Sequence, residues 1–315
     1  MRHLISLKEQ SEEDLLEILD IAKKIKEKRS KGEITDYLTN KTLIMLFQKS
    51  STRTRLSFEA GMTEIGGHAI FIDQKTTQFS LTDFKDEIRA VMRYGNVLMF
   101  RAMKAEDVEI AASFNRIPVI DACSEKYHPC QALGDILTMS EYSNGLENIK
   151  KIAWLGIENN VSNTLKLACA KLGIEVVLIS PKVNEKSVDE GLNKIADDTG
   201  LVKRTLDLKE GLKDVNYVHT DTWMDMEFFE EGKIKPEYKE EYDSRIKMFK
   251  PYQLNAKLID TYCPKARIMH CMPCHIDYEI THDAIDHKNS VIFDQAENRM
   301  HIQKAIIMWL LQKNV

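Results

Sequence analysis

Residues 50–55 (Ser-Ser-Thr-Arg-Thr-Arg) combine hydroxyl and guanidinium groups that could bind an anionic substrate. They follow an apolar run typical of a buried strand and precede a helical pattern. Backbone N–H groups at a helix N-terminus, together with hydroxyl and guanidinium groups, would hold a phosphate. The absence of glycine and of a Gly-Lys-Thr ending excludes a nucleotide P-loop. By composition alone, the segment could equally be a helix cap with two surface arginines.

Arg101 and the segment His-Pro-Cys-Gln at 128–131 lie where an α/β sheet would place its ligands. Arg101 closes the apolar run 97–100, and the second segment precedes a helical run. Open α/β sheets bind ligands outside the carboxyl ends of their strands. Taken singly, Arg101 is also compatible with a surface ion pair, and His128 with a structural histidine.

The segment His-Cys-Met-Pro-Cys-His at 270–275 suggests two other chemistries, which the rest of the sequence disfavours. It could be half of a zinc site, but no second Cys or His pair follows at metal-ligand spacing. It also resembles a thiol–disulfide redox pair, but no thioredoxin-length unit surrounds it. The six cysteines are scattered, which favours reduced thiols. We therefore expect no metal ion and a cytoplasmic location.

Strands alternating with helices are predicted around these segments. Residues 11–14 form a capping box before an amphipathic helix that ends near Gly32. Predicted strands cover residues 42–47, 68–72, 97–100, 118–120, 152–157, 174–180, 215–220 and 267–271. Further predicted helices cover about 86–94, 105–114, 161–172 and 299–311. This alternation indicates an α/β fold with two Rossmann-like domains, each a mostly parallel sheet flanked by helices.

A polar turn at 143–145 marks the predicted boundary between domains at 1–143 and 144–298. We expect the C-terminal helix, about 299–315, to pack back on the first domain. With 43% hydrophobic residues, the 315-residue chain can fill two cores. Its net charge of −5 argues against a nucleic-acid partner, and its longest apolar runs are too short to cross a bilayer. The acidic N-terminal segment is not typical of a signal peptide.

The order of the motifs closely resembles the aspartate/ornithine carbamoyltransferase family, and specifically its ornithine branch. The matching features are SSTRTR, Gln78, Arg101, HPCQ, GIENNVSN at 156–163, DTW at 221–223, HCMP at 270–273 and QAENR at 295–299. Aspartate carbamoyltransferases typically carry HPLPR where this chain has HCMPC, which disfavours that branch. The resemblance covers almost the whole chain. It implies transfer of the carbamoyl group of carbamoyl phosphate to the side-chain amine of L-ornithine, giving citrulline and phosphate.

The resemblance also implies roles for individual residues. The implied carbamoyl-phosphate ligands are Ser51, Thr52, Arg53, Thr54, Gln78, Arg101, His128, Gln131, Cys271, Met272 and Arg299. Of these, Arg101, His128 and Cys271 are implied to be catalytic, and Gln78 to reach in from a neighbouring subunit. The implied acceptor ligands are Asn160, Asp221, Asp225 and Met226. The family implies no cofactor, and a homotrimer or multiple of trimers with shared active sites.

The acceptor loop departs from the pattern usual in this family. Ornithine carbamoyltransferases usually carry D-x-x-x-S-M-G, whereas this chain has Asp225 for the Ser and Glu227 for the Gly. Two extra carboxylates would attract an ammonium group and repel a carboxylate. Putrescine, or another small diamine or amino acid, is therefore an alternative acceptor, although Asp225 could also point to solvent. The chain could also be a regulatory paralogue without catalytic activity. The retained arginines and His128 disfavour this non-enzymatic alternative.

Overall fold

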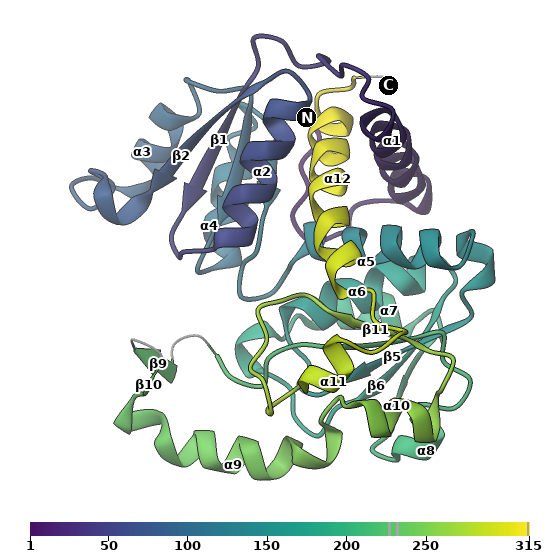
Figure 1. Cartoon of the computed structure of the whole chain (residues 1–315). Coiled ribbons are helices and arrows are strands. Elements are labelled where there is room, and N and C mark those ends of the chain that lie inside the picture. Colours follow the sequence, from purple (N-terminus) through teal and green to yellow (C-terminus); the bar gives the residue numbers. More distant parts are fainter. Residues whose placement is uncertain (226–227, 231–232, 314) are drawn as a thin grey trace.

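The computed structural model describes residues 1–225, 228–230, 233–313 and 315, and two parallel β-sheets form its framework (Figure 1). The strand order is β2-β1-β3-β4 in the first sheet and β11-β8-β5-β6-β7 in the second. The first sheet comprises β1 (Thr42–Phe47), β2 (His68–Asp73), β3 (Val97–Arg101) and β4 (Val119–Asp121). The second comprises β5 (Lys151–Leu155), β6 (Glu175–Ile179), β7 (Val202–Arg204), β8 (Tyr217–Thr220) and β11 (Arg267–His270). The predicted α/β class with two mostly parallel sheets is confirmed.

Helices flank both sheets (Figure 1). They are α1 (Glu12–Ser30), α2 (Thr52–Glu64), α3 (Phe84–Val91), α4 (Ala105–Ser113), α5 (Pro129–Tyr142), α6 (Asn160–Lys171), α7 (Glu190–Asp197), α8 (Leu208–Gly211), α9 (Lys239–Phe249), α10 (Ala256–Tyr262), α11 (His282–Ile285) and α12 (Ile292–Leu310). A short antiparallel ribbon, β9 (Phe229–Glu230) with β10 (Lys233–Ile234), precedes α9. The predicted capping box of α1 is present, with Ser11 and Asp14 bonded reciprocally. In the described ranges, no helix is long and apolar enough to span a membrane.

The strand ends determine where functional side chains meet. Every residue of β3 is buried, as expected for a parallel strand covered on both faces. Phe47 at the end of β1 pairs with Arg101 at the end of β3. In the second sheet, Thr220 at the end of β8 pairs with His270 at the end of β11. The loops that follow these strands therefore start side by side, at the carboxyl edge of each sheet.

Helix α12 begins at Ile292, earlier than the predicted start near residue 299. The turns that the prediction left out contain the polar residues Gln295 and Asn298. Both side chains are fully buried and donate hydrogen bonds to α5, Gln295 to Asp135 and Asn298 to Thr138. Because these bonds satisfy the amides, the helix can bury them. The helix contacts α1, α2 and α5 of the first half of the chain (Figure 1).

Candidate active site

The N-terminus of α2 carries the hydroxyl groups of the 50–55 segment. Ser51 caps the helix, and its Oγ donates a hydrogen bond to Thr54 Oγ1 at 2.9 Å. Thr54 is fully buried and accepts a hydrogen bond from Arg299 of α12. The first turn contains no acidic residue, so nothing offsets the positive end of the helix dipole. This terminus is suited to an anion.

Three guanidinium groups converge beside this helix end. Burial, and to a smaller extent the nearby charge of Arg101, lower the pKa of Arg299 to about 10. Burial likewise lowers the pKa of Arg53, and Arg101 adds to this effect. The Nε atoms of all three are buried and have no hydrogen-bond partner in the part of the chain that the structure describes. Buried positive charge without a partner is costly, so the site favours an anionic ligand.

The buried carboxyl of Asp121 does little to offset this charge. It ends β4, next to β3, and is fully inaccessible to solvent. Burial raises its pKa well above the ordinary value, which favours the uncharged form. The second arginine of the 50–55 segment, Arg55, is exposed, pairs with Glu59 at 3.1 Å and stacks on Phe71. Of the two arginines in the segment, Arg53 is the one in the site.

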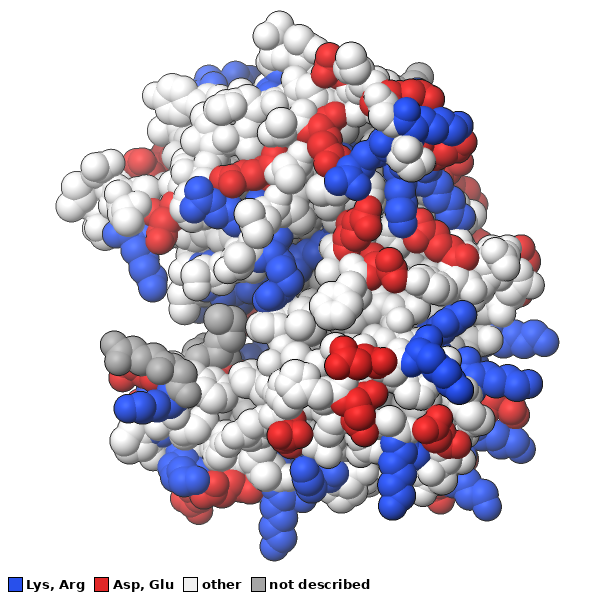
Figure 2. All heavy atoms as spheres, viewed as in Figure 1, with Lys and Arg blue, Asp and Glu red and all other residues white. Residues whose placement is uncertain are grey.

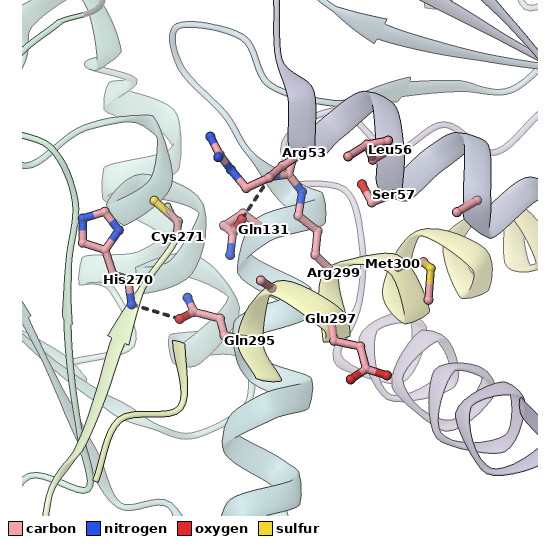
Figure 3. Close-up of a pocket in the computed structure, with 12 residues that line it drawn as sticks. Arg53, Leu56, Ser57, Gln131, His270, Cys271, Gln295, Glu297, Arg299 and Met300 are labelled. Carbon is pink, nitrogen blue, oxygen red and sulfur yellow. Dashed lines mark hydrogen bonds between the residues drawn. The ribbon is translucent and has the colours of Figure 1, made fainter. Parts of the chain in front are cut away.

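A cavity of about 330 Å³ lies against this arginine cluster (Figure 3). Arg53 of α2, Gln131 of α5 and Arg299 of α12 line one side. Cys271, in the loop after β11, lines the other side. The space-filling view shows a hollow between the two halves of the chain, with Lys and Arg side chains along its upper wall (Figure 2). Residues from both halves of the chain therefore face one site.

His128 is the N-terminal capping residue of α5, and its side chain is almost entirely buried. Its backbone N–H donates to Thr164 Oγ1 of α6 at 2.9 Å, which fixes the start of α5 against the second half of the chain. Burial lowers the pKa of His128 well below its ordinary value, and Arg299 and Arg101 lower it further. Its Nδ1 has no hydrogen-bond partner among the described residues. A neutral imidazole is thus held beside the arginines, able to bond a ligand.

A buried polar network supports both sides of the cavity. Gln131 Nε2 and Gln295 Nε2 both donate to Asp135 Oδ1, at 2.8 and 2.7 Å. The other oxygen of Asp135 lies 3.1 Å from His219 Nε2. Gln295 Oε1 accepts from the backbone N–H of His270 at 2.9 Å (Figure 3). The network joins α5, α12, β8 and β11, so it holds the arginine side and the Cys271 side in fixed register.

Asp221 and Cys271 form a carboxylate–thiol pair at the ends of β8 and β11. The thiol donates to Asp221 Oδ1 at 3.1 Å, and Asn159 Nδ2 donates to Asp221 Oδ2 at 2.7 Å. Burial raises the pKa of Cys271 well above its ordinary value, and the Asp221 charge raises it further. The thiol therefore keeps its proton and serves as a hydrogen-bond donor. This pair is the anionic part of the site.

The two adjacent asparagines have different positions. Asn159 caps α6 and contacts Asp221, although the sequence had singled out only Asn160. Asn160 Nδ2 donates to the carbonyl of Ser124 at 2.8 Å and lies 3.3 Å from Cys123 Sγ. Asn160 therefore faces the segment before α5. Because two asparagines stand side by side, their identity alone could not show that Asn159 contacts Asp221 and Asn160 contacts Ser124.

The remaining predicted residues do not line the cavity or fall outside the described ranges. Asp225 pairs with Arg245 at 3.1 Å, in contacts described below. Gln78 is exposed on the surface of its own chain, and it does not line the cavity. Met272 adjoins Cys271 with φ of 52°, and its backbone N–H donates to His270 Nδ1 at 2.8 Å. Met226, predicted to bind the acceptor, and Glu227 lie outside the residues that the structure describes.

Fold and site define a class of protein: a two-sheet α/β protein with an anion site opposite a carboxylate–thiol pair. The sequence matches two family profiles, "Aspartate/ornithine carbamoyltransferase, carbamoyl-P binding domain" over residues 2–141 and "Aspartate/ornithine carbamoyltransferase, Asp/Orn binding domain" over residues 148–310. The chain therefore belongs to the aspartate/ornithine carbamoyltransferase family, as the motifs predicted.

Individual relatives match the chain over nearly its full length. An ornithine carbamoyltransferase of Archaeoglobus fulgidus is 38% identical, covering 99% of this chain and 98% of that protein. An ornithine carbamoyltransferase of Methanospirillum hungatei is 40% identical, covering 98% of this chain and 99% of that protein. The solved structure of the Pyrococcus furiosus ornithine carbamoyltransferase has a TM-score of 0.87 and 36% identity, covering 98% of this chain and 96% of that one.

Proposed function

We propose that this protein is an ornithine carbamoyltransferase, which transfers the carbamoyl group of carbamoyl phosphate to the side-chain amine of L-ornithine. The products are citrulline and phosphate. The observation that carries this proposal is the cluster of Arg53, Arg101 and Arg299, whose buried Nε atoms have no partner in the described ranges. It lies across one cavity from Cys271, the partner of Asp221. An anionic donor and a cationic acceptor would meet between them.

The donor phosphate would bind at the N-terminus of α2. Its ligands would be Ser51, Thr52, Arg53, Thr54 and Arg299. Negative charge develops on the carbamoyl oxygen as the amine adds, and fixed donors stabilise such charge strongly because they need no reorganisation. Arg101, neutral His128 and Gln131 would supply these donors. Phosphate then leaves as an anion that the arginines already hold.

The acceptor would enter from the side of the second sheet. A free alkylamine is protonated at neutral pH, so it arrives as a cation and must lose a proton before it attacks. The Asp221 carboxylate, held by Cys271 and Asn159, would attract and orient the ammonium group. Asn160 would bind the α-carboxylate of the acceptor. Cys271 and Met272 would line the point where the two substrates meet.

One structural observation weakens the case for a diamine acceptor. Asp225 pairs with Arg245, so its charge is neutralised within the protein and is no reason to exclude an acceptor carboxylate. The retained arginine cluster, whose burial has no purpose without an anion, argues against a silent regulatory paralogue.

We further propose a cytoplasmic homotrimer, or a multiple of trimers, in which neighbouring subunits share active sites. Within each subunit, residues 1–143 would bind carbamoyl phosphate and residues 144–298 the acceptor, with the C-terminal helix returning to the first of these domains. Gln78 is exposed and does not line the cavity of its own chain, which supports sharing of sites between subunits. The net charge of −5 gives no basis for a nucleic-acid partner.

Incubating the protein with carbamoyl phosphate and a panel of amines tests the function. We expect phosphate release and an equal amount of citrulline with ornithine, and much slower turnover with putrescine. Product identification by mass spectrometry separates transfer from hydrolysis of the donor. Turnover with putrescine alone would contradict the acceptor assignment, and no turnover with any amine would contradict the enzyme assignment.

Metal removal and a cysteine pair test the role of residues 270–275. Cys274 is only partly buried, and no predicted role falls on it, so Cys274→Ser should change kcat/KM by less than about twofold. Cys271→Ala removes the donor to Asp221 and should lower kcat/KM for ornithine by roughly tenfold or more. Prolonged chelation should leave activity unchanged. Stoichiometric zinc that is lost together with activity would overturn these roles.

A further inference from the structure

Helix α9 reaches the acceptor loop through one buried arginine. Arg245 is only 5% exposed, and its Nη1 donates to the carbonyl oxygen of Trp223 at 2.8 Å. Its Nη2 donates to Asp225 Oδ2 at 3.1 Å. Glu241, one turn earlier on α9, accepts from both Nε and Nη2, at 3.0 and 2.7 Å. One guanidinium group therefore bonds the loop backbone, the loop carboxylate and its own helix.

The opposite oxygen of Asp225 is also bonded. Asn184 Nδ2 donates to Asp225 Oδ1 at 2.9 Å. The backbone N–H of Asn184 in turn donates to the carbonyl of Glu158 at 2.8 Å, just before α6. Asp225 is thus held between α9 and the segment that follows β6. Its carboxylate has a partner on each side and no need of a ligand.

Aromatic packing fixes the same loop. Trp223 is 1% exposed and stacks on Phe249 at the end of α9, with ring centroids 5.5 Å apart. The Arg245 guanidinium lies 4.7 Å from the centroid of the Phe228 ring. The loop segment 221–225 therefore begins and ends with an aspartate, and the two aspartates have different partners. Asp221 faces Cys271 and the cavity, whereas Asp225 faces α9.

We propose that Arg245 and Asp225 form a clamp that positions the acceptor loop, and that Arg245 is a positioning residue for the acceptor. This inference rests on the proposed carbamoyl transfer. The clamp holds the loop so that Asp221 stands opposite the arginine cluster, and loosening it misplaces the ammonium ligand. Asp225 then acts on every amine acceptor alike, instead of selecting between acceptors by its charge. The sequence-based expectation that Asp225 repels a carboxylate changes accordingly.

The test is a double-mutant cycle of Asp225→Ser and Arg245→Gln. Each single variant should raise the KM for ornithine about tenfold, equivalent to about 1.4 kcal/mol, because each removes the same contact. The KM for carbamoyl phosphate should stay within about twofold, since its ligands lie on other elements. The KM of the double variant for ornithine should stay within about threefold of the KM of the more impaired single variant, because the second substitution finds the contact already lost.

Glu241→Gln is the matched control. It removes the other carboxylate partner of Arg245 but leaves both contacts to the loop, so the KM for ornithine should change less than threefold. Thermal unfolding of every variant reports whether it is folded. If Arg245→Gln does not fold, Arg245→Lys and Asp225→Asn complete the same cycle, because each retains more of the native shape.

Three results would overturn the clamp. The first is multiplication of the two single effects in the double variant, which would make the residues independent. The second is a rise in KM for carbamoyl phosphate equal to that for ornithine, which would indicate general disruption. The third is a shift of preference from putrescine towards ornithine in Asp225→Ser, which would mean that the carboxylate faces the ligand. If the wild-type protein makes no citrulline, the proposed function fails, and that failure is distinct from these three.

Discussion

Arg53→Ala and Arg101→Ala should each lower kcat/KM by roughly 10²- to 10³-fold with every amine tested, because each removes a fixed positive donor from a buried site. Arg101 ends β3 and is 8% exposed, so water cannot replace its guanidinium group effectively. Arg53 lies at the N-terminus of α2, where the leaving phosphate would bind. Steady-state phosphate release with ornithine, and with a second amine, measures the loss. The fold reduction should be the same for both amines, since the arginines contact the donor.

Arg55→Ala is the matched control for these variants. Arg55 belongs to the same helix turn and residue type as Arg53, but its side chain pairs with Glu59 and stacks on Phe71 at the surface. Exposed ion pairs contribute little, so this variant should retain activity within about threefold and remain folded. Near wild-type rates in Arg53→Ala or Arg101→Ala would remove the donor-site assignment. An equal loss in Arg55→Ala would show that the helix N-terminus, and not the Arg53 side chain, had been disturbed.

The arginine side of the site was predictable because its residues lie in short motifs at the ends of strands. Apolar runs mark β1 and β3, and polar residues directly after such runs must lie at the carboxyl edge of the sheet. The register that pairs Phe47 with Arg101 then follows from the parallel sheet. Arg299 was named only through the family resemblance. Its approach to α5 depends on Gly134, where an added Cβ would lie 3.3 Å from Arg299 Cα.

The buried network was not predictable, because the sequence does not show which polar side chains find partners inside the fold. Asp135 of α5 and His219 of β8 are hydrogen-bonded to each other, although the two elements are distant in the sequence. Gln295 bonds to both of them from the first turn of α12, which begins at Ile292. No local pattern of polar and apolar residues reports a partner that lies across the fold.

The region between β8 and β11 was left almost unassigned. Helix α9 contains so many charged residues that it shows only a weak apolar face, and β9 and β10 are two residues each. The role of Arg245 depends on its contacts with Trp223 and Asp225, which local patterns do not report. The clamp was therefore visible only in the structure, whereas the unusual residue Asp225 was visible in the sequence.

Mixing an inactive Gln78→Ala variant with an inactive Arg101→Ala variant should restore activity if subunits share sites. Gln78 is exposed on its own chain, and the neighbouring Phe79 is buried, so the loop is anchored with Gln78 directed outwards. In a mixed trimer, a subunit with intact Arg101 would meet an intact Gln78 from its neighbour. Random exchange of equal amounts should make about a quarter of the sites intact. Citrulline formation after verified subunit exchange is the measurement.

A second mixture of variants distinguishes shared sites from a general effect of mixing. Arg53→Ala and Arg101→Ala alter two residues that converge in a single chain, as the influence of Arg101 on the pKa of Arg53 indicates. Every site in their mixture lacks one arginine, so no activity should return. Recovery only with the Gln78 variant would assign Gln78 to the neighbouring site and make the trimer obligatory for turnover. Absence of recovery in both mixtures, despite exchange, would count against sharing, because each chain would then need its own Gln78.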